Sequence, residues 1–176
     1  DAERGALRRW TPDRVNWNKP WDMLHGSGTT EYLLIIPDRV DPTRGTFKWI
    51  PNEERARNNA QVHYQHAEGL DVKGHELFFV TKRYMLYTLD LDQGTWSLQS
   101  TRLGVLDGRF DQIQRIVKDE NELMYFTEDE AGKAAGIFAR NRKGQFFSIL
   151  VSREGHCFLF CHLSTNPLHP HRKVPR

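Results

Sequence analysis

Acidic side chains recur in this sequence beside short apolar segments, and they are its best candidates for chemistry. The strongest set is Glu68, Asp111, Glu128 and Asp129. Carboxylate oxygens are hard ligands of the kind that Ca²⁺ prefers, and one calcium ion takes about six to eight of them. Glu68 stands out because it begins an otherwise apolar segment, where a charge without a partner is costly. The alternative is that these acids cap turns and face water.

A zinc site near the end of the chain is less well supported. Its ligands would be two cysteines and three histidines: Cys157, Cys161, His162, His169 and His171. The cysteine spacing suits zinc, but the apolar residues between the cysteines are typical of a strand. His63 and His66 have helical spacing without a third ligand nearby. No Gly-x-Ser-x-Gly or P-loop motif occurs, so the sequence predicts neither a serine nucleophile nor a nucleotide site.

A repeat in the sequence indicates the elements that must position the acids. Gly45, Gly94 and Gly144 are spaced by 94 − 45 = 49 and 144 − 94 = 50 residues. Each follows a polar turn, and each turn follows an apolar segment with strand-forming residues. The pattern predicts three β-hairpins, with glycine in each turn because it adopts positive φ at little cost.

Two of these hairpins have further matching strands before them. Glu76–Thr81 matches Glu122–Thr127 at an offset of 46 residues, and each is preceded by a short apolar strand, 69–72 or 112–116. The result is a unit of four antiparallel strands that spans roughly 45–50 residues, which is typical of a β-propeller blade. The alternative is an ordinary meander or sandwich in which the similarity arose by chance.

The predicted fold class is all-β, an incomplete β-propeller segment built of antiparallel four-stranded repeats with irregular flanks. The expected parts are an irregular Trp-containing arm at 1–30, a half blade at 31–50, blades at 68–101 and 111–151, and a disordered tail at 152–176. A short helix capped by Asn52 is expected after the half blade. Because propellers close with about 4–8 blades, this chain cannot close one alone and would leave open strand edges.

Composition excludes several function classes. The 25 Lys and Arg residues nearly balance the 23 Asp and Glu residues, so the net charge of +2 gives no general reason to bind nucleic acid. No apolar run approaches the roughly 18 residues of a membrane span. Two cysteines exclude a disulfide scaffold. The chain starts at Asp1 without a signal segment, so either a part was removed or it is a piece of a longer protein.

Five segments, taken in order, resemble the PhoX-type alkaline phosphatases. They are residues 67–71, 76–80, 111–113, 123–129 and 135–140, and the resemblance covers about residues 30–151. It is closest to secreted eukaryotic relatives, so it implies an extracellular location. It also implies a β-propeller that hydrolyses phosphate monoesters with calcium and iron in its channel.

The resemblance assigns roles to the acids one by one. Glu68 takes the place of a metal-binding glutamate, and Asp111 matches the acid of an Asp-Asn-Ile-like segment whose Asn is Gln112 here. Glu128 and Asp129 match a Glu-Asp-Gly segment in which glycine is replaced. Ca²⁺ is therefore the expected ion.

Two departures limit what the resemblance implies. The family's N-terminal iron-binding cysteine segment is not seen here, so Fe³⁺ is expected only in a full-length relative. After Val151 the expected Glu-Thr-Thr-Gly-like motif is replaced by an unrelated tail. We therefore expect a fragment or divergent member of a PhoX-like phosphate-monoester hydrolase that is not catalytically competent, with a calcium-type carboxylate site retained.

The competing hypothesis is a non-catalytic β-module that binds a protein partner through an open edge or the Trp-rich arm. The sequence predicts no oligomeric state. Convergence of Glu68, Asp111 and Glu128 would favour a metal site with a phosphate ester as ligand. Side chains that point apart into solvent would favour the binding module.

Overall fold

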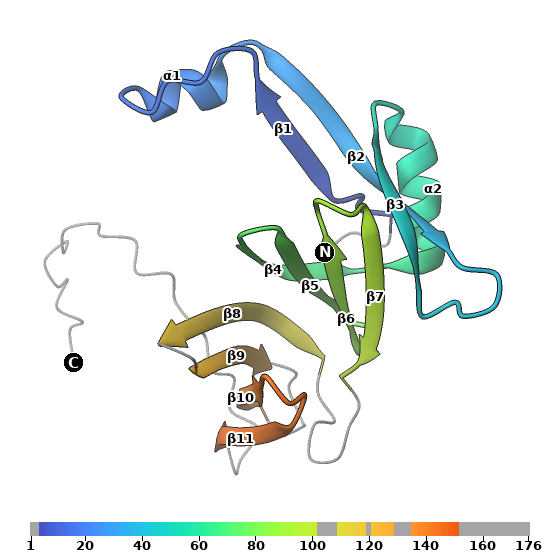
Figure 1. The fold of residues 1–176 in the computed structure, drawn as a ribbon, viewed down its shortest axis with the longest axis vertical. Helices are drawn as coiled ribbons and strands as arrows, with labels where there is room; N and C mark the ends of the chain where they lie inside the picture. The colour runs from blue at the N-terminus through green and yellow to red at the C-terminus, as the bar shows by residue number, and fades with distance from the viewer. Residues whose placement is uncertain (1–3, 102–108, 119–120, 129–134, 152–176) are drawn as a thin grey trace, which may run out of the picture.

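The computed structural model describes residues 4–101, 109–118, 121–128 and 135–151, which form two curled antiparallel sheets and two helices (Figure 1). The first sheet has the order β1-β2-β3-β7-β6-β5-β4. Its strands are β1 (Arg8–Pro12), β2 (Gly28–Pro37), β3 (Arg44–Ile50), β4 (Ala67–Lys73), β5 (Glu76–Thr81), β6 (Met85–Asp90) and β7 (Thr95–Ser100).

The second sheet is a four-stranded meander in which each strand pairs with the next. Its strands are β8 (Phe110–Lys118), β9 (Asn121–Glu128), β10 (Gly136–Asn141) and β11 (Phe146–Val151). The antiparallel four-stranded units predicted from the repeat are therefore confirmed, since β4–β7 form the same meander within the first sheet. The tail at 152–176 lies outside the described residues.

Two of the three hairpin glycines have the predicted positive φ. Gly94 and Gly144 have φ of +65° and +77°, as the turn chemistry requires. Gly45 differs, because it lies inside β3 and not in a positive-φ turn. A Cβ at Gly45 would lie 2.1 Å from the Ile36 carbonyl oxygen, so glycine is needed there for the close approach of β2.

The N-terminal segment 1–30 contains regular structure where an irregular arm was expected. β1 pairs with the first half of β2, and α1 (Pro20–His25) lies between them along the chain. The long edge of β2 explains this, because it offers backbone hydrogen bonds to a second strand. Trp17 and Trp21 are exposed on this part of the chain.

The expected helix after the half blade is confirmed as α2 (Glu53–His63). Asn52 is its N-cap, and the Asn52 side chain accepts a hydrogen bond of 2.9 Å from the Arg55 backbone N–H. Ala56 and Ala60 are fully buried, which lets the helix lie close against the sheet. None of the helices in the described ranges is long and apolar enough to cross a membrane.

Two hydrophobic cores lie on the two faces of the β4–β7 meander. One core joins β2, β3 and α2 to Leu77, Phe79 and other residues of β5–β7. The other joins Phe78 and Val80 of β5 to the inner face of the second sheet. β5 is therefore buried on both faces, because its alternate side chains enter different cores.

The two meanders meet through matching residues. Phe78 and Val80 share the second core with Met124 and Phe126, which lie 46 positions later and match them in the repeat. Blades of a propeller are related by rotation about a common axis, so matching residues would face different interfaces. The all-β, antiparallel class is thus observed, and the arrangement of the units as propeller blades stays a prediction.

Candidate functional site

Three of the four predicted site residues lie where the two sheets touch. Glu68 lies in β4, Asp111 in β8 and Glu128 at the end of β9, while Asp129 falls outside the described residues. A Cβ at Gly69 would lie only 2.5 Å from the backbone nitrogen of Ile113, so the β4 and β8 backbones are in direct contact there. This contact brings the neighbouring Glu68 and Asp111 to the same end of the sheets.

Both of these acids lie at irregularities of their strands. The pairing of β4 with β5 shifts between Ala67 and Leu70, and the pairing of β8 with β9 shifts between Phe110 and Gln112. Such bulges re-aim side chains that a regular strand would direct elsewhere. Phe110 pairs with Glu128, so the third acid lies beside the second bulge. We call Glu68, Asp111 and Glu128 the acidic end.

The acidic end is shielded from water. Glu128 is 1% exposed, and the side chain of Asp111 is 16% exposed. The Oε1 atom of Glu68 is buried and has no hydrogen-bond partner among the described residues. Lys82 supplies a cation, with its Nζ 2.5 Å from Oδ1 of Asp111. Asp111 and Glu128 are therefore largely buried and do not act as solvent-facing turn caps, whereas Glu68 is half-buried.

The donor set does not fit Ca²⁺ in this arrangement. Within the ranges that the structure describes, no group of three or more His, Cys, Asp or Glu side chains is arranged to hold a metal ion. An ammonium group also contacts Asp111, the central acid of the set. The cysteines of the weaker zinc hypothesis lie outside the described residues. His63 and His66 belong to no metal-binding group among those described.

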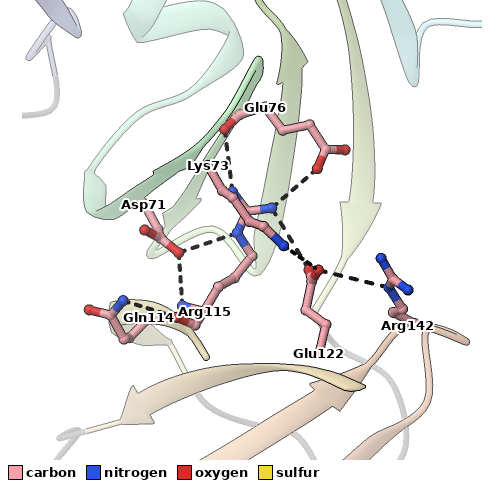
Figure 2. A network of polar contacts seen from close by, with 7 residues as sticks. All are labelled: Asp71, Lys73, Glu76, Gln114, Arg115, Glu122 and Arg142. Atoms are coloured by element: carbon pink, nitrogen blue, oxygen red, sulfur yellow. Dashed lines mark hydrogen bonds and ion pairs between the residues drawn. The ribbon is translucent and has the colours of Figure 1, made fainter. Parts of the chain in front are cut away.

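A second charged cluster, which the sequence analysis did not identify, lies elsewhere on the contact between the sheets. Figure 2 shows Arg115 of β8 among Asp71, Glu76 and Glu122. The Arg115 side chain is 2% exposed, and its Nε lies 3.3 Å from Asp71 Oδ2. Its guanidinium carbon lies 4.0 Å from the ring centre of Phe78, in a cation–π arrangement.

The remaining contacts of this cluster hold the two sheets together. Arg115 Nη1 lies 3.2 Å from Glu76 and 3.8 Å from Glu122, and the Arg115 backbone N–H donates to Asp71. Glu122 also contacts Lys73 at 3.3 Å and Arg142 at 3.9 Å. Three acids thus face three bases, so the cluster is neutral and its role is structural.

The repeat contains a signal for this charged cluster. Asp71 pairs with Phe78 across β4 and β5, and Arg115 pairs with Met124 across β8 and β9. Because Phe78 and Met124 match, Asp71 and Arg115 occupy matching positions with opposite charge. Aligning β4 with β8 through the strands with which they pair, β5 and β9, would have revealed Asp71 and Arg115 as a pair of opposite charge.

Two buried tyrosines are structural. Burial raises the pKa of Tyr64 and of Tyr87 well above the ordinary range. The Tyr64 hydroxyl donates to the Leu33 carbonyl at 2.8 Å, and the Tyr87 hydroxyl donates to the His63 carbonyl. Both hydroxyls therefore stay protonated and serve to join α2, β2 and β6.

Comparisons with protein families, with curated proteins and with solved structures find no match to this chain.

Proposed function

We propose that this chain is a divergent segment of a PhoX-like phosphate-monoester hydrolase, in which further strands would have to repack the two meanders as blades of a larger propeller. The observation that supports the proposal most is the placement of Glu68 and Asp111 at strand irregularities where β4 and β8 touch, with Glu128 paired beside the second irregularity. These are the acids to which the resemblance assigns metal binding. Asp111 and Glu128 are more buried than an ordinary turn-capping role requires.

The chain by itself is not a competent hydrolase in this proposal. A phosphate monoester is an anion, and buried carboxylates repel it unless metal ions offset their charge. The described residues do not form a metal cage, so the offsetting charge at Asp111 comes from Lys82. Hydrolysis would require ligands contributed by further strands and a different arrangement of this lysine.

Turnover of 4-nitrophenyl phosphate with added Ca²⁺ and Fe³⁺ tests the proposal. We expect the full chain to release no more nitrophenol than its Glu68→Gln variant. Glu54→Gln, an exposed substitution on α2, is the matched control. Metal-dependent turnover that disappears only in Glu68→Gln would show a complete centre and contradict the incompetence of the chain. Turnover that survives in Glu68→Gln would remove this acid from any catalytic site.

A second candidate function is a β-module that binds a protein partner through the outer face of the second sheet. In edge strand β11, Phe147, Ile149, Leu150 and Val151 are 36–50% exposed. Ile116 of β8 is 55% exposed and lines a groove of about 480 Å³ with Tyr125 and Ile137. The inner face of the same sheet is covered by the first sheet. An apolar face beside an unpaired edge is typical of a binding surface.

Light scattering on size-exclusion fractions tests whether that partner is a second copy of the chain. Self-association through this face predicts a larger mass for the wild type than for Ile149→Lys. The control is Val40→Lys, since Val40 is apolar and even more exposed than Ile149 but lies far along the chain from β11. Equal masses for all three proteins would exclude self-association through β11.

A further inference from the structure

Arg140 is a half-buried arginine with a buried donor atom that no described residue satisfies. It lies in β10, where it pairs with Met124 of β9 and with Phe146 of β11. Its Nε atom is buried and has no hydrogen-bond partner among the described residues. A guanidinium group presents five N–H donors, and burying one of them without an acceptor is unfavourable. A folded protein seldom leaves such a donor unpaired without a reason.

The charge of Arg140 is not balanced by the described acids around it. Burial lowers the pKa of the Arg140 guanidinium, and the charge of Glu122 raises it. Glu122, however, already contacts three other bases, which are Lys73, Arg115 and Arg142 (Figure 2). With Arg140 added, four bases stand against the three acids of this cluster, Asp71, Glu76 and Glu122. One positive charge is therefore in excess, and a bound anion would offset it.

The turn beside Arg140 leaves an open space that faces two donor groups. Gly144, with φ of +77°, lies in the turn from β10 to β11. A Cβ at Gly144 would lie 3.7 Å from Arg140 Nη2 and 3.8 Å from Gln99 Nε2. Apart from the chain neighbours of Gly144, these are the only described atoms within 4 Å of that point. Because Gln99 belongs to β7, donors from both sheets face one small volume.

The turn that borders this space is held in place by Asn141. The Asn141 side-chain oxygen accepts from the Gln145 backbone N–H at 3.0 Å, and the Asn141 carbonyl accepts from the Gly144 N–H at 2.9 Å. The guanidinium carbon of Arg140 lies 5.9 Å from the ring centre of Phe146, within the range of a cation–π contact. The donors are therefore positioned before a ligand arrives, which lowers the entropic cost of binding.

We propose that Arg140 and Gln99 form a binding site for a small oxyanion, either a phosphate or a carboxylate group. Arginine presents its N–H donors in a planar fork that matches the oxygens of both groups. The Gln99 amide would donate from the other sheet, and the anion would offset the excess positive charge. The site is separate from the acidic end, because Glu128 pairs with Gly136 at the opposite end of β10. It does not depend on the hydrolase function proposed above.

Calorimetric titration of the full chain with inorganic phosphate or with acetate, at constant ionic strength in chloride, tests the proposal. We expect one saturable site for at least one of these anions. Tighter binding of phosphate would identify a phosphate site, and tighter binding of acetate a carboxylate site. Arg140→Met keeps the apolar stem but removes the charge and the donors, so it should weaken binding at least about tenfold. Gln99→Leu, which removes the second donor, should weaken binding by about threefold or more.

Two further variants act as controls. Arg142→Met removes an exposed arginine near the same turn, which contacts Glu122 at 3.9 Å, and should bind the anion within about threefold of the wild type. Arg140→Lys keeps the charge without the planar fork, so its affinity should lie between those of the wild type and Arg140→Met. Equal losses in Arg142→Met and Arg140→Met would show that positive charge alone attracts the anion, which would overturn the site.

Unfolding in urea supplies a readout that needs no ligand. In a chloride buffer, Arg140→Met should be at least as stable as the wild type, because it removes a buried donor without a partner. Adding the anion that binds should stabilise the wild type and leave Arg140→Met unchanged, since a ligand of the folded state alone shifts the equilibrium toward it.

Three other results would overturn the proposal. The first is the absence of saturable binding of either anion to the wild type. The second is equal affinity in the wild type and in Arg140→Met. The third is an Arg140→Met protein that is clearly less stable than the wild type in chloride, or that fails to fold, because the guanidinium would then already have its partners within the chain.

Discussion

Arg115 illustrates how a single residue can join two sheets. Its guanidinium is 2% exposed, lies over the Phe78 ring and contacts acids of both sheets. Removing such a charged group from water costs free energy, and its partners offset this cost only while all of them are present. The stability of the sheet contact therefore depends on the whole cluster and not on one ion pair.

Replacing Arg115 by Met should destabilise the protein by about 3–5 kcal/mol, because Asp71 would stay shielded without its cation. Urea unfolding followed by tryptophan fluorescence measures the change. The matched control is Arg142→Met, since the Arg142 side chain is 63% exposed and contacts Glu122 at 3.9 Å. We expect the control to cost less than about 1 kcal/mol. Equal losses in the two variants would contradict the role of burial.

His63 gives the protein a predictable response to pH. Burial lowers the pKa of His63, although its place at the end of α2 would favour a cation. The unfolded chain therefore takes up the proton first as pH falls. The stability that neutral His63 contributes is complete above about pH 6.5 and decreases as pH falls below that value.

Urea unfolding at about pH 7 and about pH 5 should show that the wild type loses more stability than His63→Gln over this interval. Glutamine is polar and similar in size but does not titrate. The same loss in both proteins would assign the pH dependence to other groups.

At this scale the sequence offered the acids as candidates but not the side chains that contact them. Glu68, Asp111 and Glu128 could be selected because each lies beside an apolar strand. Lys82 and Arg115 could not, because their importance comes from contacts with residues 29 and 44 positions away in the chain. A lysine in a turn and an arginine in a strand look like ordinary surface residues when the opposite sheet is not known.

Among the elements, α2 protects the edge of β2. β1 pairs with β2 as far as Tyr32, and beyond that point no strand among the described residues lies beside this edge of β2. Asn59 of α2 replaces the missing strand at Ile35, donating to its carbonyl at 2.8 Å and accepting from its N–H at 2.7 Å. A helix side chain thus completes the hydrogen bonding of a buried strand residue.

Replacing Asn59 by Ala should cost about 1–3 kcal/mol, because both backbone groups of Ile35 would lose their partner in a buried place. Chemical denaturation gives the magnitude, and amide hydrogen exchange at Ile35 should accelerate. Asn58→Ala is the control, since Asn58 is exposed and bonds only to the Arg4 side chain at the surface. Unchanged exchange at Ile35 in Asn59→Ala would contradict this account.

Local rules predicted the elements well. Short apolar segments that recur in order marked the strands of both meanders, and Asn52 marked the start of α2. The turn prediction was wrong at Gly45, the first glycine of the series. This glycine allows a close contact between strands and does not adopt a positive φ. The same residue type answers two different physical needs, and spacing alone does not distinguish them.

At the scale of the whole molecule, matching surfaces of the two meanders form one core. Phe78 and Val80 face Met124 and Phe126 across it, with the acidic end and the Arg115 cluster as polar ties. The repeat predicted two similar sheets, but it held no information on which faces would meet. That choice depends on packing between residues far apart in sequence, which strand periodicity does not report.

Calorimetric titration of Ca²⁺ into the wild-type chain tests the central claim most directly, namely that Lys82 and not a metal offsets the charge of Asp111. We predict no saturable heat of binding at neutral pH and an identical trace for Glu68→Gln. Stoichiometric calcium binding that disappears in Glu68→Gln would contradict the account.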